Sequence, residues 1–349
     1  MYYPIKFRPV YKDYIWGGRY FEKLGRELPE GVVAESWEVS CHKSGLSVVA
    51  NGEFAGRTLT ELIKSDPVGV VGTKFPSGCS EIPLLVKLID ANDKLSVQVH
   101  PDDNYAAVFE NSFGKNEMWY VIATKPSAKL VAGLKENVTR EKFLRAVKEN
   151  RIEDCLLQVE VMPGDVINIP AGTVHSIGEG IVIAEIQQTS DITYRLFDYN
   201  RVDKNGVRRQ LHLNKALDVI NFGAGRRMAK CDGVKVEVND TSSKTVFVAN
   251  RYFACERYEL NGEVTEKCDG SKFCIYIFLE GNGEIKTGEA NVKVNAGETV
   301  FLPAASGEYT VSGKLKTLKT YIPDLISDIV DPMRNSGCTN SQIYKVLNS

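Results

Sequence analysis

The sequence predicts a mainly β protein made of two β-barrel or β-sandwich domains with a few short helices. Two observations support this fold class. Short stretches rich in β-branched and aromatic residues recur at even spacing, with glycine, asparagine and aspartate between them. A strand-and-turn phrase also occurs twice, at residues 164–170 and 297–303, with the same separation between its glycine and its proline.

The clearest strands combine β-branched or aromatic residues with turn residues at their ends. They are residues 36–40, 84–89, 119–122, 182–186 and 273–279. Short helices are expected at residues 59–63, 139–147 and 214–220. The second of these helices begins at Thr139, a favourable N-cap, and places Phe143, Leu144 and Val147 on one face.

The repeated phrase divides the chain into an N-terminal domain over residues 1–225 and a C-terminal domain over residues 226–323. A run of glycine and arginine near residues 223–233 interrupts the strand pattern there, and residues 279–285 are expected to form a hairpin turn in the second domain. Apolar residues at helical spacing predict a helical tail over residues 324–349, packed against the body.

Composition excludes several classes of protein. Hydrophobic residues make up 43% and charged residues 25% of the chain, and the net charge of −2 gives no basic footprint for nucleic acid or an anionic membrane. No apolar run is long enough for a membrane span, and residues 1–8 lack the apolar core of a signal peptide. The eight scattered cysteines form no CxxC pair, which indicates reduced thiols in a cytoplasmic protein.

Three phrases offer ligands for one metal ion. Residues 164–175, GDVINIPAGTVH, describe a strand that ends in a tight Pro-Gly turn and presents His175 just beyond it. Gln98 and His100 are two residues apart on a strand and therefore share a face. Glu117 follows in a further phrase. Because the chain has only 4 histidines, two of them in these phrases, we expect a deliberate metal site.

The second copy of the phrase lacks these ligands. Glu308 stands where His175 would be, and the sequence has no histidine after His212. The C-terminal domain is therefore expected to be structural and free of metal.

Several charged residues lie in apolar or strand-like surroundings. Lys87 sits within an apolar run, where burial tends to lower the pKa of a lysine, so it is a candidate base or phosphate ligand. An edge-strand lysine that reaches solvent is an equally good interpretation. Glu185 lies in a similar run. Arg195 follows on a strand segment, and its guanidinium can clamp a phosphate or an enediolate.

Two further groups of charges have alternative interpretations. Asp102 and Asp103 are either partners of a ligand imidazole or caps of a helix that starts near residue 104. Arg201 belongs to a basic cluster with Lys204, Arg208 and Arg209. For the last three, a solvated loop is the simpler interpretation. The chain has no P-loop, so any phosphate must be held by side chains.

Seven motifs together resemble the type I mannose-6-phosphate isomerases of the cupin superfamily, in their short bacterial form. The phrase at residues 164–175 matches the second cupin signature, and Gln98-x-His100 is a modified form of the first. The other matching segments are residues 14–18, 34–40, 83–89, 115–120 and 185–195. The resemblance covers the chain up to about Pro323 and implies two jelly-roll barrels of the cupin type.

Carried onto matching positions, the resemblance implies one zinc ion held by Gln98, His100, Glu117 and His175. It implies catalytic roles for Arg195, Lys87 and Lys115. It also implies substrate contacts from Trp16, Glu35 and Asp191. Arg201, the first residue of the basic cluster, is a further expected substrate contact. Ile177 stands where some members of the family carry an aromatic residue, so a substrate contact made by that ring does not transfer to this chain.

The implied reaction is aldose–ketose isomerisation of a small sugar phosphate, mannose 6-phosphate to fructose 6-phosphate, through an enediol. A site with nitrogen and oxygen ligands also suits iron, manganese or cobalt, so the choice of zinc rests on the resemblance. The alternatives are an isomerase of another phosphosugar and a non-catalytic sugar-phosphate-binding cupin. A metal-dependent dioxygenase is a poorer fit, because such sites usually have more histidine ligands than this one. The sequence leaves the general base and the oligomeric state open.

Overall fold

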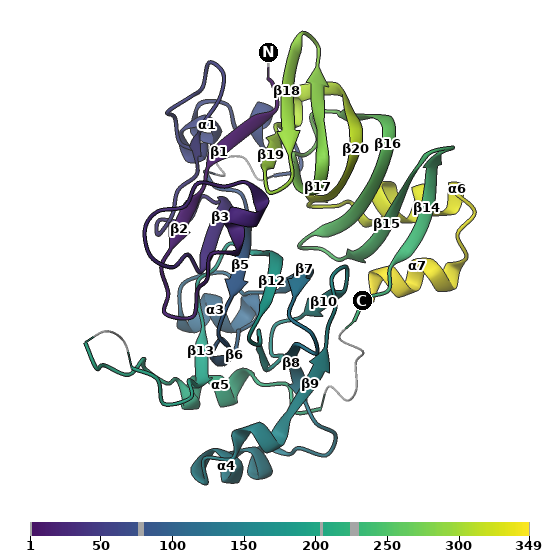
Figure 1. Ribbon diagram of the computed structural model, residues 1–349. Helices are drawn as coiled ribbons and strands as arrows, with labels where there is room; N and C mark the ends of the chain where they lie inside the picture. The colour runs from purple at the N-terminus through teal and green to yellow at the C-terminus, as the bar shows by residue number, and fades with distance from the viewer. Residues whose placement is uncertain (1, 76–79, 203–204, 224–229, 349) are drawn as a thin grey trace.

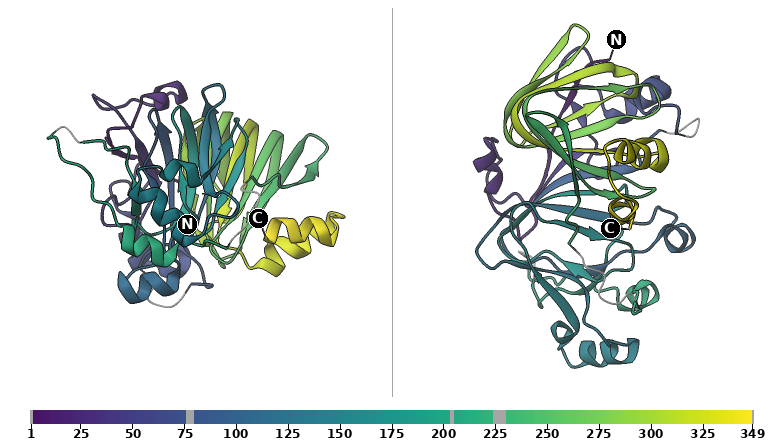
Figure 2. Two further views of the ribbon diagram at one scale, coloured as in Figure 1. Left: turned by 90° about the horizontal axis from the view of Figure 1, so that it is seen from below. Right: turned by 90° about the vertical axis from the view of Figure 1, so that its right-hand side faces the viewer.

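Three β-sheets organise the computed structural model, which describes residues 2–75, 80–202, 205–223 and 230–348 (Figure 1). A six-stranded and a five-stranded sheet form the first barrel, and a nine-stranded sheet curves into the second. Figure 2 shows the second barrel beside the first, with the C-terminal helices against the second. The predicted mainly β fold with few short helices is confirmed.

The first barrel encloses an apolar core between its two sheets, and this core includes Trp16, Trp119, Ile177 and Ile183. The six-stranded sheet contains β10 (Val166–Ile169), β7 (Glu117–Thr124), β12 (Ile181–Gln188), β5 (Leu84–Ala91), β3 (Glu35–Val39) and β2 (Val10–Lys12), in that order. The five-stranded sheet contains β13 (Tyr194–Phe197), β6 (Val97–Val99), β11 (His175–Ser176), β8 (Lys129–Leu134) and β9 (Leu156–Glu160).

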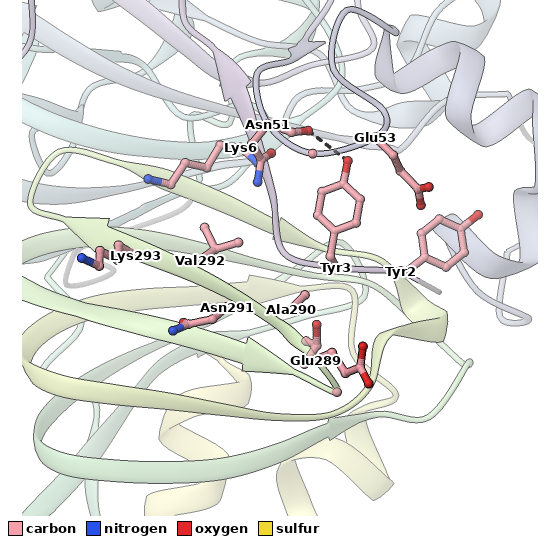
Figure 3. A pocket seen from close by; sticks show the side chains of 13 residues that line it. Tyr2, Tyr3, Lys6, Asn51, Glu53, Glu289, Ala290, Asn291, Val292 and Lys293 are labelled. Carbon is pink, nitrogen blue, oxygen red and sulfur yellow. Dashed lines mark hydrogen bonds between the residues drawn. The ribbon is translucent and has the colours of Figure 1, made fainter.

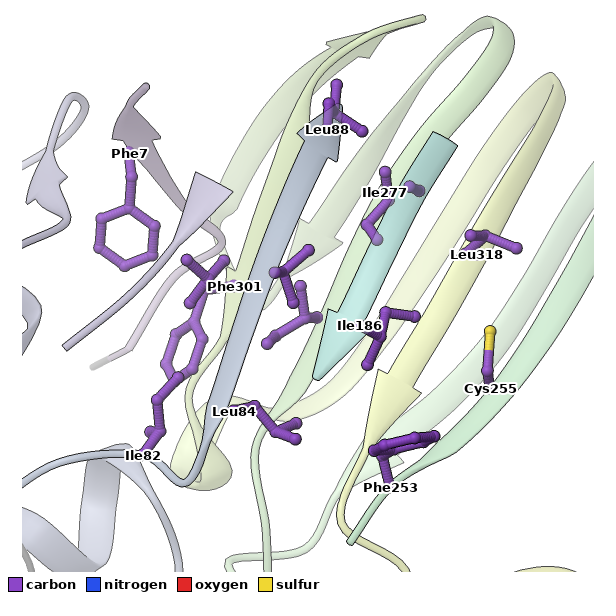
Figure 4. Close-up of a cluster of buried hydrophobic side chains, with 14 of the residues drawn as sticks. Phe7, Ile82, Leu84, Leu88, Ile186, Phe253, Cys255, Ile277, Phe301 and Leu318 are labelled. Carbon is purple, nitrogen blue, oxygen red and sulfur yellow. The ribbon is translucent and has the colours of Figure 1, made fainter. Parts of the chain in front are cut away.

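Strand β5 is buried along its whole length, which decides the environment of Lys87. Leu84, Val86 and Leu88 belong to the apolar cluster between the two barrels. Figure 4 shows Leu84 and Leu88 in this cluster. Because side chains alternate along a strand, Lys87 points to the opposite face, into the first barrel. The edge-strand interpretation of Lys87 is therefore wrong, since β3 and β12 pair with β5 on its two sides.

The part of the chain before Val234 also contains short helices. The three predicted helices are confirmed, and the cap at Thr139 accepts a hydrogen bond from the backbone N–H of Lys142. Asp102 caps α3 through the N–H of Tyr105, which confirms the capping interpretation for Asp102. The helices are η1 (Tyr20–Leu24), α1 (Leu59–Ser65), α2 (Pro67–Val70), α3 (Asp103–Phe109), α4 (Arg140–Lys148), η2 (Ile152–Cys155) and α5 (Leu213–Val219).

The nine-stranded sheet combines both ends of the chain. Near its amino end the chain contributes β1 (Ile5–Arg8), which pairs with β19 and with β4 (Val48–Val49). The other strands are β14 (Val234–Asn239), β15 (Ser242–Ala249), β16 (Ala254–Cys268), β20 (Gly307–Tyr321), β17 (Cys274–Thr287), β18 (Ala290–Asn295) and β19 (Thr299–Leu302). Sheet membership thus does not follow a single cut in the sequence. The boundary predicted at residue 225 lies outside the described residues.

The hairpin turn predicted at residues 279–285 is wrong. Strand β17 runs without interruption through this segment, and a bulge between Phe278 and Glu280 shifts its register against β20. Gly281 has a φ of 77°, and a Cβ there would lie 2.0 Å from the carbonyl oxygen of Lys314. A glycine at this position permits a bend and a close backbone approach inside a strand.

The tail folds into helices against the second barrel, as its apolar spacing predicted. These are η4 (Leu325–Val330), α6 (Asp331–Asn335) and α7 (Asn340–Leu347), and a short η3 (Ala304–Ser306) precedes β20. Ile329, Met333, Ile343 and Val346 pack into the core of the second barrel. The outer strands β14 and β15 contact α7.

In the part of the chain that the structure describes, no helix is long and apolar enough to cross a membrane. The described cysteines are thiols and none is in a disulfide, whereas Cys79 lies outside the described residues.

Candidate active site and metal centre

The structure brings His100, Glu117 and His175 together in the buried interior of the first barrel. Nε2 of His100 lies 3.2 Å from Oε1 of Glu117, and Nε2 of His175 lies 3.6 Å from Oε2. The potential ligand atoms of the three residues all lie within 4.8 Å of one another. His175 stands opposite Gln98 on paired strands β11 and β6, so adjacent strands place these side chains on a common face.

The protonation states of these residues suit a divalent cation. Each histidine uses its Nδ1 toward a backbone carbonyl, His100 toward Ile192 at 2.7 Å and His175 toward Thr173 at 2.8 Å. Such bonds fix the tautomer and leave the Nε2 lone pairs directed at Glu117. Burial lowers the pKa of His100 to about 3 and also lowers the pKa of His175, so both imidazoles are neutral.

Glu117 has the unmet acceptor capacity expected of a metal ligand. Its carboxylate is buried, and within the described residues neither of its oxygens accepts a hydrogen bond of good geometry. Burial raises the pKa of Glu117, but the charge of Lys115 and the contact with His100 outweigh burial and hold it well below its usual value. The ammonium of Lys115 lies 2.7 Å from Oε1 without a hydrogen bond of good geometry, so this buried, ionised carboxylate keeps acceptor capacity that a further cation can use. The donor set therefore fits a metal ion.

Gln98 lies at the same centre, with its amide 3.2 Å from Nε2 of His175. The oxygen and nitrogen of an amide are assigned from their contacts, so the oxygen can occupy either position. Ser96 contacts the other end of this amide at 3.5 Å. The alternative interpretation, in which Asp102 and Asp103 contact a ligand imidazole, is wrong. The Nδ1 atoms of both histidines contact backbone carbonyls instead.

Lys115 is buried beside the candidate ligands. Its Nζ lies 2.7 Å from Oε1 of Glu117 and 3.2 Å from Nε2 of His100. The sequence placed it two residues before Glu117, and the structure shows that its ammonium occupies the same pocket as the carboxylate. This lysine therefore supplies a fixed positive charge next to any bound metal.

Lys87 belongs to a second charged group, on the same six-stranded sheet as Glu117. Its ammonium lies 3.2 Å from Glu185 and 3.7 Å from Glu35. Burial alone lowers the pKa of Lys87, but the carboxylates of Glu35, Glu185 and Glu117 outweigh it and raise the pKa above the ordinary value. The lowered pKa expected from its apolar surroundings is therefore wrong, and Lys87 is a permanent cation.

Glu185 has the opposite shift. Burial and the nearby charge of Glu117 raise its pKa, while Lys87 opposes them. Its Oε1 accepts a hydrogen bond from Nε1 of Trp119 at 3.0 Å. Strand register explains this group, because Lys87 faces Trp37 on one side and Glu185 on the other, and Glu185 faces Trp119.

Arg195 stands opposite Gln98 on paired strands β13 and β6 and is only partly buried. Its Nε donates to Oγ of Ser96 at 3.3 Å, and Nη1 donates to the carbonyl of Gln210 at 3.0 Å. Burial, together with the charge of Arg209, lowers its pKa from the ordinary value. The arginine thus lies one strand away from a candidate metal ligand.

Two further arginines share one buried carboxylate. Asp198 accepts from Nη2 of Arg201 at 2.6 Å and from Nε of Arg209 at 2.8 Å. Arg201 also contacts Asp93 and the carbonyl of Lys94. The solvated-loop interpretation is wrong for Arg209, which is half-buried and paired, whereas Arg208 is exposed and Lys204 lies outside the described residues.

The remaining predicted site residues have different surroundings. Trp16 is buried in the barrel core and its ring stacks against Tyr14. Glu35 accepts a hydrogen bond from Nε1 of Trp37 at 2.7 Å. The side chain of Asp191 is 56% exposed and lies 3.5 Å from the ring of His42. The buried group does not include Asp191, which lies at the surface.

Sequence reasoning missed several polar residues of this region. Tyr14, Ser96, Asp198 and Tyr199 were given no role, although Asp198 organises two arginines and Ser96 contacts Arg195. The alternation of β6 was an available signal for Ser96, because Ser96, Gln98 and His100 are successive positions on one face.

A separate surface hollow of about 990 Å³ lies between the amino-terminal segment and the β17–β18 hairpin (Figure 3). Tyr2, Tyr3 and Lys6 line one side of it, and residues 287–293 line the other. None of the predicted site residues lines this hollow, so it is not the centre described above.

The fold and the buried His–Glu–His group define a cupin-type protein with a candidate metal centre in its first barrel. Comparisons with known proteins specify the family. The family model "Phosphomannose isomerase type I, catalytic domain" matches residues 5–145, and "Mannose-6-phosphate isomerase, cupin domain" matches residues 243–322. The chain belongs to the type I mannose-6-phosphate isomerases, a family of aldose–ketose isomerases.

Individual relatives support this assignment over most of their length. The chain is 36% identical to the probable mannose-6-phosphate isomerase GmuF of Bacillus subtilis over 90% of this chain and 97% of that protein. It is 34% identical to mannose-6-phosphate isomerase ManA of the same organism, over 91% and 99%. The crystal structure of the mannose 6-phosphate isomerase from Bacillus subtilis superposes with a TM-score of 0.84 at 32% identity, over 91% of this chain and 99% of that chain.

Proposed function

We propose that the first barrel interconverts mannose 6-phosphate and fructose 6-phosphate through an enediol intermediate with the help of a zinc ion. The observation that carries this proposal is the buried carboxylate of Glu117, which has no good hydrogen bond and lies between two neutral imidazoles and Lys115. The relatives named as mannose-6-phosphate isomerases support the choice of substrate.

Gln98, His100, Glu117 and His175 are the residues that would hold the ion. A zinc ion with nitrogen and oxygen ligands supplies Lewis acidity toward a sugar oxygen. The neutral imidazoles and the ionised carboxylate are already in the protonation states that such binding requires.

The surrounding cations stabilise negative charge that develops on the sugar. Lys87, Lys115 and Arg195 have this role, because an enediolate oxygen is favoured by preorganised positive charge in a site that excludes water. Lys87 and Lys115 are buried, and carboxylates hold both in place. Trp16, Glu35, Asp191 and Arg201 contact the substrate, with Arg201 held in position by Asp198.

Proton transfer between C2 and C1 needs a group that can both accept and return a proton. The raised pKa of Lys87 makes it a poor base, so a carboxylate is the better candidate. Glu185 is the carboxyl group of this cluster with a raised pKa, and we assign the proton transfer to it. The reaction takes place in the cytoplasm on a free small-molecule sugar phosphate.

The test is an isomerase assay with mannose 6-phosphate on the purified protein, with and without a chelator, together with elemental analysis. We expect one zinc per chain, loss of turnover when it is removed, and recovery on adding zinc back. Glu185→Gln should keep its metal yet lose exchange of the C2 proton with solvent. Full turnover of metal-free protein would contradict the proposal, and another metal at full occupancy would contradict zinc.

A further inference from the structure

The second barrel contains a polar interior that the sequence did not predict. A cavity of about 290 Å³ opens there, lined by residues of β15, β16, β17 and β20 and by the tail. Glu256, Tyr258 and Glu266 are at alternate positions of β16, and Lys319 and Tyr321 are at alternate positions of β20. These side chains therefore share the inner face of the curved sheet.

The carboxylate of Glu266 is well supplied with donors. The hydroxyl of Tyr276 donates to its Oε2 at 3.1 Å and that of Tyr309 at 2.7 Å. The ammonium of Lys319 donates to the same oxygen, and the hydroxyl of Tyr258 contacts Oε1. Glu266 thus has little acceptor capacity left for a cation, in contrast to Glu117.

The carboxylate of Glu256 is similarly engaged. Lys244 donates to its Oε1 at 3.2 Å and the hydroxyl of Tyr321 at 3.3 Å. The hydroxyl of Tyr258 lies 3.1 Å from its other oxygen. Buried Glu256 and partly buried Glu266 are therefore held by a common layer of tyrosines and lysines.

The lysines of the cavity, in contrast, keep unused donors. Each ammonium has three N–H groups and no acceptor capacity. Within the described residues, Lys244, Lys272 and Lys319 each donate one hydrogen bond to a carboxylate. The acceptor of Lys272 is Asp328, at 2.7 Å. Each of these ammoniums thus keeps N–H groups with no hydrogen-bond acceptor among the described residues, and a bound group should be rich in acceptor oxygens.

The charges around this cavity cancel in pairs. Among the residues that line it, Lys244 pairs with Glu256, Lys319 with Glu266, and Lys272 with Asp328. Lys74, outside this lining, makes a second and longer contact with Asp328 at 3.6 Å. At the rim, exposed Lys267 is matched by exposed Asp269. Because the sum is neutral, the cavity has no excess positive charge to favour an anion. Its acceptor-rich partner should therefore be uncharged.

The tail forms one wall of the cavity. Ser327, Asp328 and Pro332 line it from η4 and α6, and the family model for this barrel ends at residue 322. The ammoniums also lie over tyrosine rings, with Nζ of Lys319 at 5.3 Å and Nζ of Lys272 at 5.6 Å from the ring centre of Tyr321. Alternating donors, acceptors and ring faces are the surface that a polyhydroxylated molecule requires.

We propose that the second barrel holds a binding site for an uncharged polyhydroxylated ligand of the size of a hexose or hexitol, with Lys244, Lys272 and Lys319 donating to its hydroxyl oxygens. The tail closes the site on one side. It is separate from the metal centre of the first barrel and does not depend on the isomerase reaction.

The experiment is calorimetric titration of the purified full chain with D-mannose, D-fructose, D-mannitol and inorganic phosphate. The key variant is Lys272→Gln/Asp328→Asn, which removes one cation and one carboxylate from the lining of the cavity together. Lys74, which lies 3.6 Å from Asp328 and does not line the cavity, loses this contact in the variant. Lys316→Gln/Glu280→Gln is the matched control, because that pair, 2.7 Å apart, connects β20 to β17 at a position outside the cavity. Circular dichroism and isomerase activity check the fold of each variant.

We expect one of the three sugars or polyols to bind at one site per chain. The key variant should weaken this binding about tenfold, the effect of losing one hydrogen bond to a charged group, while the control leaves it unchanged. The same titration with Arg195→Ala should match the wild type, which separates this site from the active site. No binding by any of the three, binding equally strong in the key variant, or binding of phosphate alone would overturn the proposal.

Discussion

The two barrels share an architecture but differ in which hydrogen-bonding capacity their interiors leave unused. In the first barrel, both oxygens of Glu117 have no good donor among the described residues, and two imidazole lone pairs point at them. In the second, Glu266 accepts from tyrosines and a lysine, and the ammoniums keep free N–H groups. The unused acceptor capacity of a buried carboxylate indicates a site for a cation. The unused N–H groups of lysines that are each paired with a carboxylate indicate a site for a neutral ligand rich in oxygen.

This contrast arises from a few positions on otherwise similar strands. His175 follows the Pro-Gly turn of the first barrel, and Glu308 occupies the corresponding place in the second, where it is exposed at the start of β20. A difference at one turn therefore removes a metal ligand without changing the sheet around it.

The largest expected effect comes from breaking the acceptor cluster of the first barrel. His100→Ala/His175→Ala should lose the metal completely and reduce turnover to the assay background, because two ligands disappear at once. Glu308→Gln, at the corresponding turn of the second barrel, should keep both metal and activity. Elemental analysis and the isomerase assay check the two variants. A full metal content in the double variant would disprove the assigned ligands.

A smaller loss is expected when charge is kept but its geometry is changed next to the metal centre. Arg195→Lys retains a positive charge without the planar fork, and we expect turnover to fall on the order of a hundredfold with normal metal content. Steady-state kinetics and elemental analysis measure both quantities. If Arg195→Ala retained near-normal turnover, the arginine would have no part in the reaction.

The carboxylate of Glu266, in the second barrel, should affect the stability of the protein rather than its turnover. Burial opposes ionisation of Glu266, but Lys319 and the tyrosines outweigh it and lower its pKa from 4.5 to about 2. A lowered folded-state pKa means that the stabilisation is present above about pH 4.5 and is lost as the pH falls toward 2. The shift corresponds to about 3 kcal/mol of unfolding free energy.

Glu266→Gln tests this linkage. The variant should be less stable by about 3 kcal/mol at neutral pH, since Lys319 loses its charged partner, and its stability should depend less on pH between 4.5 and 2. Denaturant unfolding at several pH values measures both effects. An unchanged acid dependence would show that Glu266 is not the titrating group.

The smallest expected effect concerns the tail. Thr339 caps α7 in a capping box with Gln342, and Thr339→Ala should reduce stability by about 1 kcal/mol. Turnover should be unchanged, because the apolar residues of the tail pack into the core of the second barrel. Thr139→Ala, which removes the cap of α4 on the first barrel, is the matched variant. A loss of turnover in Thr339→Ala with normal metal content would show that the two barrels are coupled.

Local sequence signals predicted much of the fold. Thr139 and the apolar spacing after it predicted α4, and the glycine and proline of residues 164–170 predicted the strand end before His175. These features depend on residues close in sequence. The prediction failed at residues 279–285, because the close approach of β20 makes Gly281 part of a bent strand instead of a turn.

The sequence by itself determined the class of fold and the identity of the candidate metal ligands. Those ligands are recognisable from short spacings, as with Gln98 on β6 and His100 directly after that strand. Tertiary structure decided the charge state of Lys87, because Glu35 and Glu185 come from neighbouring strands and raise a pKa that burial alone would lower. It also decided the polar interior of the second barrel. Side chains far apart in sequence meet there, and electrostatic interactions depend on distance in space.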